Sequence, residues 1–304
     1  MRQALVILTM VILTTTRLFA QGYVDQQAVY PLLETQIGDI DNVPKVDWEV
    51  YIYKDHNKKD GKGQWSELLA YIKDLPGEYT GDRRYVIELT NRVTGDNMKM
   101  GQKLLIPKSF PNDWRAYSPY PFQYAAATDM PKLFIIDKST QTFGAYEYGK
   151  LVRWGLVSTG RNDDLTPVGR YNFNWKDDYR LSSEAPEGEL WEMYWMFNFD
   201  ARLGMHVHQY SLPIAYPASH GCVRVSEADA KWNFGWANGW SQSGGRVSRN
   251  GTPVMVIGHN PAGRPQQWNI SGEGAVSSVD LPSNMESIPL GSYAQREADW
   301  ASGQ

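Results

Sequence analysis

Short apolar segments recur about every ten residues after Lys132, and this spacing constrains the fold more than any other feature of the chain. The segments cover residues 133–136, 142–148, 151–158 and 170–175, and residues that favour turns separate them. Short strands at such a spacing are typical of antiparallel sandwiches and of barrel-like sheets. We therefore expect a mainly β domain with a sandwich or barrel-like sheet.

This β-rich domain continues well into the second half of the chain. Residues 227–236 have the composition of a short helix, and residues 252–257 form an apolar run that suits a closing strand. We place the domain at residues 131–258.

A smaller module is predicted before it, at residues 45–108. Apolar side chains within residues 64–73 follow helical spacing, and residues 98–107 combine a turn with an apolar strand that ends at Pro107. The pattern predicts a small α+β unit.

Two further segments differ from these domains in composition. Residues 109–130 are rich in Pro, Tyr and Ala, which favours a linker between the two domains. Residues 259–304 are mostly polar and rich in Ser, Gly and Gln, which favours a flexible polar tail.

The start of the chain has the layout of a signal peptide, which we assign to residues 1–20. Arg2 supplies the positive end, residues 4–15 are largely apolar, and Ala20 suits cleavage. The apolar run is shorter than the roughly 20 residues of a spanning helix. We expect export to the periplasm or cell envelope without stable membrane insertion, unless the signal stays uncleaved and anchors the chain.

The charge of the chain argues against one class of partner. The formal net charge is −4 and the sequence pI is about 5.8, with no basic stripe. Nucleic-acid binding draws on clustered positive charge, so we expect no nucleic-acid partner.

Cys222 is the only cysteine in the chain, and three of the five histidines lie in the sixteen residues before it. These are His206, His208 and His220. A single thiol cannot form an internal disulfide. It is therefore a nucleophile, a metal ligand or an inert buried side chain.

The residues around Cys222 suit acyl transfer. A thiol attacks a carbonyl only as its thiolate, and a neighbouring imidazole can take the proton or stabilise the anion. Gly221 allows a substrate backbone to approach closely. The amides of Gly221 and Cys222 could then form an oxyanion hole.

Residues 219–224, Ser-His-Gly-Cys-Val-Arg, resemble the Ser-His-Gly-Cys-x-Arg/Asn signature of L,D-transpeptidases, the YkuD-type catalytic domain. That family also has a histidine 16 to 18 residues before the cysteine, and His206 lies at 16. Residues 157–160 and 166–169 match the strand and turn that precede its site. The similarity covers roughly residues 131–258.

The resemblance implies a cysteine-dependent acyltransferase of peptidoglycan. The thiol would attack the bond between the diamino acid and the terminal D-Ala of a tetrapeptide stem, forming a thioester and releasing D-Ala. An amine of a second stem, or of a protein, would then take the acyl group. Members of the family are acylated by carbapenems, and no cofactor or metal is implied.

The resemblance also implies roles for the reacting groups. Cys222 is the nucleophile, and His206 is the base, held at its second nitrogen by a backbone carbonyl. His220 lines the site beside them. His208 faces the same side of a strand as His206, because only Val207 separates the two, so it could also face the thiol. It is the alternative to His206 as the base, although it lies only 14 residues before Cys222.

Five residues are expected to contact substrate. They are Gly221, Ser219, Arg224, His208 and Tyr194, with Arg224 either binding a substrate carboxylate or bracing the loop.

The N-terminal module resembles a LysM unit, a small βααβ fold that binds glycans. The match rests on Asn91 and on residues 101–107, Gly-Gln-Lys-Leu-Leu-Ile-Pro. It would add glycan strands to the stem peptides as expected partners.

Three alternatives to transpeptidation remain open at this point. The same thiol could hydrolyse stems as an L,D-carboxypeptidase. The three histidines and Cys222 could hold a tetrahedral zinc ion. The chain could also bind the cell wall without catalysis.

Overall fold

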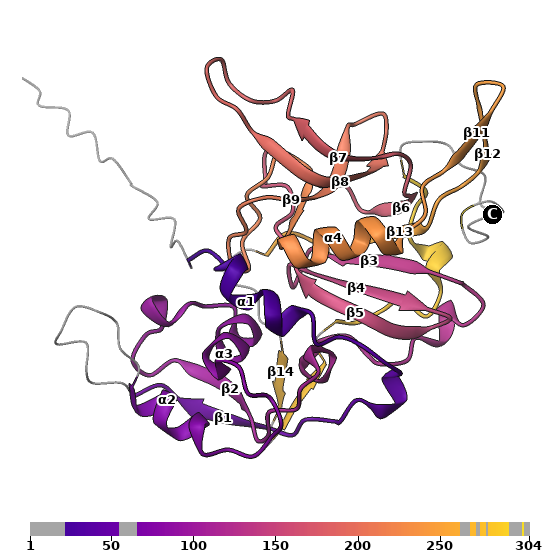
Figure 1. Ribbon diagram of the computed structural model, residues 1–304. Coiled ribbons are helices and arrows are strands. Elements are labelled where there is room, and N and C mark those ends of the chain that lie inside the picture. Colours follow the sequence, from indigo (N-terminus) through magenta and orange to yellow (C-terminus); the bar gives the residue numbers. More distant parts are fainter. Residues whose placement is uncertain are drawn as a thin grey trace, which may run out of the picture.

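The computed structural model describes residues 22–54, 66–261, 268–271, 274–277 and 279–291, together with Trp300 (Figure 1). The predicted signal peptide at residues 1–20 lies outside the described residues. No helix in this part of the chain is both long and apolar enough to cross a membrane.

A five-stranded sheet forms the centre of the β-rich domain. Its strands run in the spatial order β5-β4-β3-β13-β6, with β13 parallel to β3 and antiparallel to β6. The bounds are β3 (Leu133–Asp137), β4 (Thr142–Glu147), β5 (Lys150–Leu156), β6 (Gly169–Asn172) and β13 (Pro253–Ile257).

A second sheet of four strands carries the histidines. Its order is β10-β9-β8-β7, and only the β10–β9 pair is parallel. The strands are β7 (Lys176–Leu181), β8 (Glu192–Asp200), β9 (Met205–Gln209) and β10 (Val223–Val225), followed by helix α4 (Glu227–Trp236). Neither sheet closes into a barrel, so the mainly β, sandwich-like prediction is confirmed and its barrel-like variant is not.

The five-stranded sheet is buried on both faces. Phe134 and Ile136 of β3 pack into the core shared with the four-stranded sheet, whereas Leu133 and Ile135 pack into the core of the N-terminal region. Strand β13 alternates in the same way. Burial on both faces explains why these strands are continuously apolar in sequence rather than alternating.

The N-terminal region follows the order β1-α2-α3-β2, with β1 antiparallel to β2. The bounds are β1 (Trp48–Ile52), α2 (Ser66–Lys73), α3 (Arg83–Asn91) and β2 (Lys103–Pro107). Asn91 ties helix to strand, because its side chain donates to the carbonyl of Leu105 at 2.8 Å and accepts from the same residue's amide at 2.7 Å.

The segment predicted as a linker, residues 109–130, is instead part of the core. It contains two short 3-10 helices, η4 (Trp114–Tyr117) and η5 (Ala125–Ala127). Trp114 is fully buried and stacks on Trp154 of β5 with ring centroids 4.6 Å apart. The composition suggested a spacer, but the aromatic side chains of this segment fill the space between the two regions.

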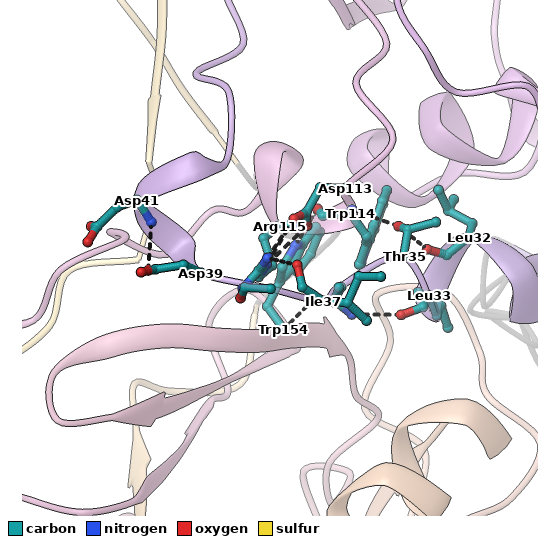
Figure 2. A network of polar contacts seen from close by, with 12 residues as sticks. Leu32, Leu33, Thr35, Ile37, Asp39, Asp41, Asp113, Trp114, Arg115 and Trp154 are labelled. Carbon is teal, nitrogen blue, oxygen red and sulfur yellow. Dashed lines mark hydrogen bonds and ion pairs between the residues drawn. The ribbon is translucent and has the colours of Figure 1, made fainter.

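Polar contacts hold this segment in place (Figure 2). Arg115 donates to the carbonyls of Ile37 and Gly38 and pairs with Asp113 at 2.7 Å. Trp154 donates from its indole to the carbonyl of Trp114 at 2.8 Å. The segment is therefore fixed to both of its neighbours.

Helix α1 (Gln26–Leu33) packs against α4, so the start of the described chain contacts the β-rich domain. A buried guanidinium, Arg153 of β5, joins them by ion pairs to Glu34 at 2.9 Å and to Asp229 of α4 at 2.8 Å.

The remaining elements are short. They are η1 (Ile40–Asn42), η3 (Gly95–Asn97), β11 (Ser241–Ser243), β12 (Arg246–Arg249), β14 (Trp268–Ser271), β15 (Gly274–Ser277) and η6 (Met285–Ser287).

Within the predicted tail at residues 259–304, several described residues pack on the domain. Val279 is buried, and the indole of Trp300 donates to the carbonyl of Tyr171 at 2.8 Å. The carbonyl of Pro289 accepts from the amide of Arg170 at 2.8 Å. These residues form structure that the polar composition did not predict.

Candidate active site

Strand β9 presents two histidines to one cavity. His206 and His208 both line it, while Val207 between them is 1% exposed and packs into the core between the sheets. This is the alternation expected of a strand. The cavity has a volume of about 450 Å³.

The loop before β10 brings Cys222 to the same cavity. Residues 158–160 brace this loop on both sides, since Ser158 bridges to Arg224 and Gly160 bridges to Ser219. Cys222 itself stays partly exposed. Residues 219–224 are thus held by bridges to residues 158–160, while Cys222 remains partly exposed.

Thr166 fixes the peptide that carries the thiol. Its hydroxyl donates to the carbonyl of Gly221 at 2.7 Å and accepts from the amide of Gly160 at 2.9 Å. Gly221 has φ +112°, a conformation that favours glycine. In a trans peptide the C=O and N–H point in opposite directions, so the amide of Cys222 points away from Thr166.

The amide of Gly221 has a different partner from the one predicted. It donates to the hydroxyl of Ser219 at 3.1 Å, and that hydroxyl donates in turn to the carbonyl of Cys222. Ser219 is therefore a brace within the loop. Of the two amides predicted for an oxyanion hole, Gly221's is already engaged.

Cys222 and His206 form the central pair of the site. The thiol Sγ lies 3.7 Å from Nδ1 of His206 and 3.8 Å from the carbonyl oxygen of Gly204. The second ring nitrogen, Nε2, lies 3.1 Å from the side-chain amide of Asn198, not against the backbone carbonyl that we predicted.

Asn198 is itself fixed from several sides. Its Nδ2 donates to the carbonyls of Met205 and Asp200 at 3.1 and 3.2 Å, and its Oδ1 accepts from Asn174 at 2.8 Å. The fully buried amide therefore sets the orientation of the His206 ring. No sequence motif indicates this contact, because it is strand pairing that brings Asn198 opposite His206.

Burial keeps the resting pair uncharged. Desolvation raises the pKa of the Cys222 thiol to about 11. Burial, with smaller contributions from the nearby His208 and Arg180, lowers the pKa of His206 to about 3. At neutral pH the pair is thus a thiol beside a neutral imidazole, not a thiolate–imidazolium ion pair.

The hairpin of β7 and β8 forms a wall of the cavity. From it, Arg180 lies over the ring of Trp175 at 5.2 Å, and Trp191 stacks on His220 with centroids 5.1 Å apart. Among the described residues, Arg180 has no ion-pair partner. The wall therefore offers a free guanidinium and an aromatic surface to a ligand.

The structure brings most of the predicted residues together. The cavity is lined by Cys222, His206, His208, His220, Ser219 and Arg224. Gly221 lies buried behind the thiol. Arg224 is held over the ring of Tyr210 at 4.7 Å.

Tyr194 is the exception among the predicted substrate contacts. It is not among the cavity-lining residues; it packs against Tyr179 with centroids 5.2 Å apart, while its neighbour Met193 lines the cavity. Adjacent residues on a strand face opposite sides of the sheet, so the prediction was displaced by one position. The residues that we had not singled out are Asn198, Arg180 and Trp191.

The zinc alternative depends on a cluster of ligands. Over residues 22–54, 66–261 and the shorter described segments, no group of three or more His, Cys, Asp or Glu side chains is arranged to hold a metal ion.

Comparison with known proteins defines the class of this domain. Residues 131–256 match the family model of the YkuD L,D-transpeptidase catalytic domain. The match covers strands β3 to β10, helix α4 and all but the last residue of β13, and so includes Cys222 and His206. This part of the chain is therefore similar in sequence to L,D-transpeptidase catalytic domains of the YkuD type.

Solved structures of L,D-transpeptidases resemble it at low identity. A Stackebrandtia nassauensis enzyme is 24% identical, with 44% of this chain and 58% of that one covered and a TM-score of 0.35. A Mycobacterium smegmatis enzyme is 19% identical, with 52% and 64% covered and a TM-score of 0.35. L,D-transpeptidase 3 of Mycobacterium tuberculosis, in complex with a faropenem-derived adduct, is 20% identical, with 42% and 60% covered and a TM-score of 0.33.

This chain thus spans less than two thirds of the length of each of these structures. No curated protein matches it.

Proposed function

We propose that this protein is a peptidoglycan L,D-transpeptidase that uses Cys222 as its nucleophile. The observation that carries the proposal is the contact of 3.7 Å between Sγ of Cys222 and Nδ1 of His206 on the floor of an open cavity. The contact lies within the segment that matches the family model.

In the first half of the reaction the thiol attacks the carbonyl between the diamino acid and D-Ala of a tetrapeptide stem. His206 takes the thiol proton at Nδ1 as the C–S bond forms and returns it to the amine of D-Ala as the C–N bond breaks, a role that uses the tautomer with the ring proton on Nε2. The product is a thioester on Cys222.

The developing oxyanion needs a donor that is free at the site. The amide of Cys222 suits this role, since Thr166 holds the preceding carbonyl in the opposite direction. The amide of Gly221 does not, because it donates to Ser219.

Charged groups in the cavity suit a substrate rich in carboxylates. Arg224 and Arg180 lie on different sides of the site, each backed by an aromatic ring. His220, stacked on Trp191, supports the stem between them. In the second half of the reaction an amine of a neighbouring stem takes the acyl group and cross-links the two stems.

The remaining proposals concern where the enzyme works and what inhibits it. The sequence at residues 1–20 supports export to the periplasm, and the β1-α2-α3-β2 order of the N-terminal region supports a LysM-like role in glycan binding. Solved L,D-transpeptidases occur in complex with imipenem and with a faropenem-derived adduct. We extend this to acylation of Cys222 by carbapenems.

The test is mass spectrometry of products after incubating the mature protein with a disaccharide-tetrapeptide. We expect a dimer that has lost one D-Ala, absent with Cys222→Ala. Tripeptide alone, again dependent on Cys222, would point to the carboxypeptidase. Unchanged substrate with folded, reduced protein would contradict the proposal.

A further inference from the structure

His208 is a second imidazole in the cavity that the first half of the reaction does not use. It lies two residues beyond His206 on the same face of β9, and it is 4% exposed. Two residues along a strand correspond to about 6.6 Å. The two rings therefore line neighbouring parts of one cavity.

The proton of the neutral His208 ring has a defined position. Nδ1 lies 3.0 Å from the backbone carbonyl oxygen of Gln209. A carbonyl oxygen only accepts, so Nδ1 carries the proton and Nε2 keeps its lone pair. Within the described part of the chain, Nε2 has no hydrogen-bond partner.

The surroundings keep His208 neutral. Burial, with a smaller contribution from the positive charge of Arg224, lowers the pKa of His208 to about 4. Arg224 faces His208 directly across the parallel β9–β10 pair. At neutral pH the ring is therefore a base with one free acceptor atom, beside a guanidinium that suits a carboxylate of the substrate.

His206 differs in both respects. Its Nδ1 is next to the sulfur and its Nε2 contacts the Asn198 amide, so both nitrogens are engaged in the resting site. Once the thioester has formed, the incoming amine must lose a proton to become an amide. Of the two imidazoles on β9, His208 is the one whose second nitrogen is available for it.

We infer that His208 is the general base of the second half-reaction. Its Nε2 takes one proton from the acceptor amine while nitrogen bonds to the thioester carbon. The C–S bond then breaks with its electron pair on Sγ, and the proton passes to the sulfur, which restores the thiol. This inference rests on the proposed function, because it requires a thioester on Cys222.

The test separates the two half-reactions. His208→Asn keeps a donor for the Gln209 carbonyl and removes Nε2, and His206→Asn is the matched control on the same strand face. The full mature protein is mixed with tetrapeptide stem and quenched over time. Intact-protein mass spectrometry reports the acyl-enzyme, and product analysis reports its resolution.

For His208→Asn we expect acyl-enzyme to form within about threefold of the wild-type rate, and its resolution to slow by about 100-fold, as for loss of a general base. For His206→Asn we expect no acyl-enzyme. The melting temperature of each variant reports its folding.

Two outcomes would overturn the inference alone. Resolution at the wild-type rate in His208→Asn would show that Nε2 does not act as a base. Equal losses of acylation and resolution would show that His208 only supports the site as a whole. If the wild type formed no acyl-enzyme, the proposed function would fail and this inference with it.

Discussion

The floor and the wall of the cavity are built in opposite ways. The floor consists of β9, β10 and the loop at residues 219–222, whose polar groups are bonded to one another and mostly buried. The wall is the β7–β8 hairpin, where Tyr179 and Leu190 are 44% and 75% exposed. A floor of this kind holds reacting atoms in place, whereas an exposed hairpin can change its side chains without loss of the fold.

The largest effect that we expect concerns the charge state of the floor. For a thiol with a pKa near 11, the thiolate fraction rises tenfold with each unit of increase in pH as long as the pH is below the pKa. Alkylation of Cys222 by iodoacetamide should therefore accelerate about 100-fold between pH 6 and pH 8 and continue to rise above pH 9. A plateau between pH 5 and pH 8 would instead indicate a thiolate–imidazolium pair and would contradict our account of burial.

The second prediction concerns a hydrogen bond of the floor that does not involve the thiol. Thr166→Val removes the hydroxyl between Gly160 and Gly221 and frees the peptide before Cys222. We expect acylation to slow by about 30-fold, less than the loss of a whole oxyanion donor, and stability to fall by about 1–3 kcal/mol.

Thr90→Val is the matched control, since Thr90 is also fully buried and donates to the carbonyl of Val86 in α3. It should lower the melting temperature but leave the acylation rate of the folded protein unchanged. Equal rate losses in both variants would mean that Thr166 acts only through stability.

The third prediction removes a charge from the wall. Arg180→Gln should raise KM for a tetrapeptide stem about tenfold, equivalent to about 1.4 kcal/mol of binding, with a smaller change in kcat. Arg249→Gln, on the exposed strand β12, is the control and should leave KM unchanged. A loss confined to kcat would assign Arg180 to the floor's chemistry instead.

The smallest effect should come from the outer face of the wall. Tyr194→Ala is expected to change kcat/KM by less than about twofold, because its ring packs on Tyr179 and does not line the cavity. Trp191→Ala on the inner side removes the ring stacked on His220 and should lower kcat/KM several-fold. If Tyr194→Ala had the larger effect, substrate would contact both faces of the hairpin.

The sequence predicted the floor well because its information is local. Cys222, Ser219 and Arg224 stand in one short segment, and the alternation of β9 places both His206 and His208 on one face. Residues that are contiguous in sequence stay close together in any fold, so their proximity can be predicted without knowing the rest of the structure.

The contacts missed from sequence depend on the register of strand pairing and on packing between segments that lie apart in the chain. Asn198 meets His206 through a strand register, and Arg180 and Trp191 come from a hairpin that precedes the motif by about thirty to forty residues. Trp114 was assigned to a linker because composition does not reveal that its ring stacks on Trp154. Neither kind of contact produces a recognisable sequence pattern at the residues that make it.

The burial of the five-stranded sheet on both faces has a consequence for how the enzyme reaches its substrate. Leu133, Ile135 and Met255 belong to the same apolar core as the helices of the N-terminal region. Among the described residues, the N-terminal region and the β-rich domain thus share one apolar core rather than being joined by a flexible linker. A glycan site on the N-terminal region and the thiol of Cys222 would therefore stay at a fixed distance from each other. The spacing of glycan strands and stem peptides in the cell wall would then determine which stems the thiol can reach.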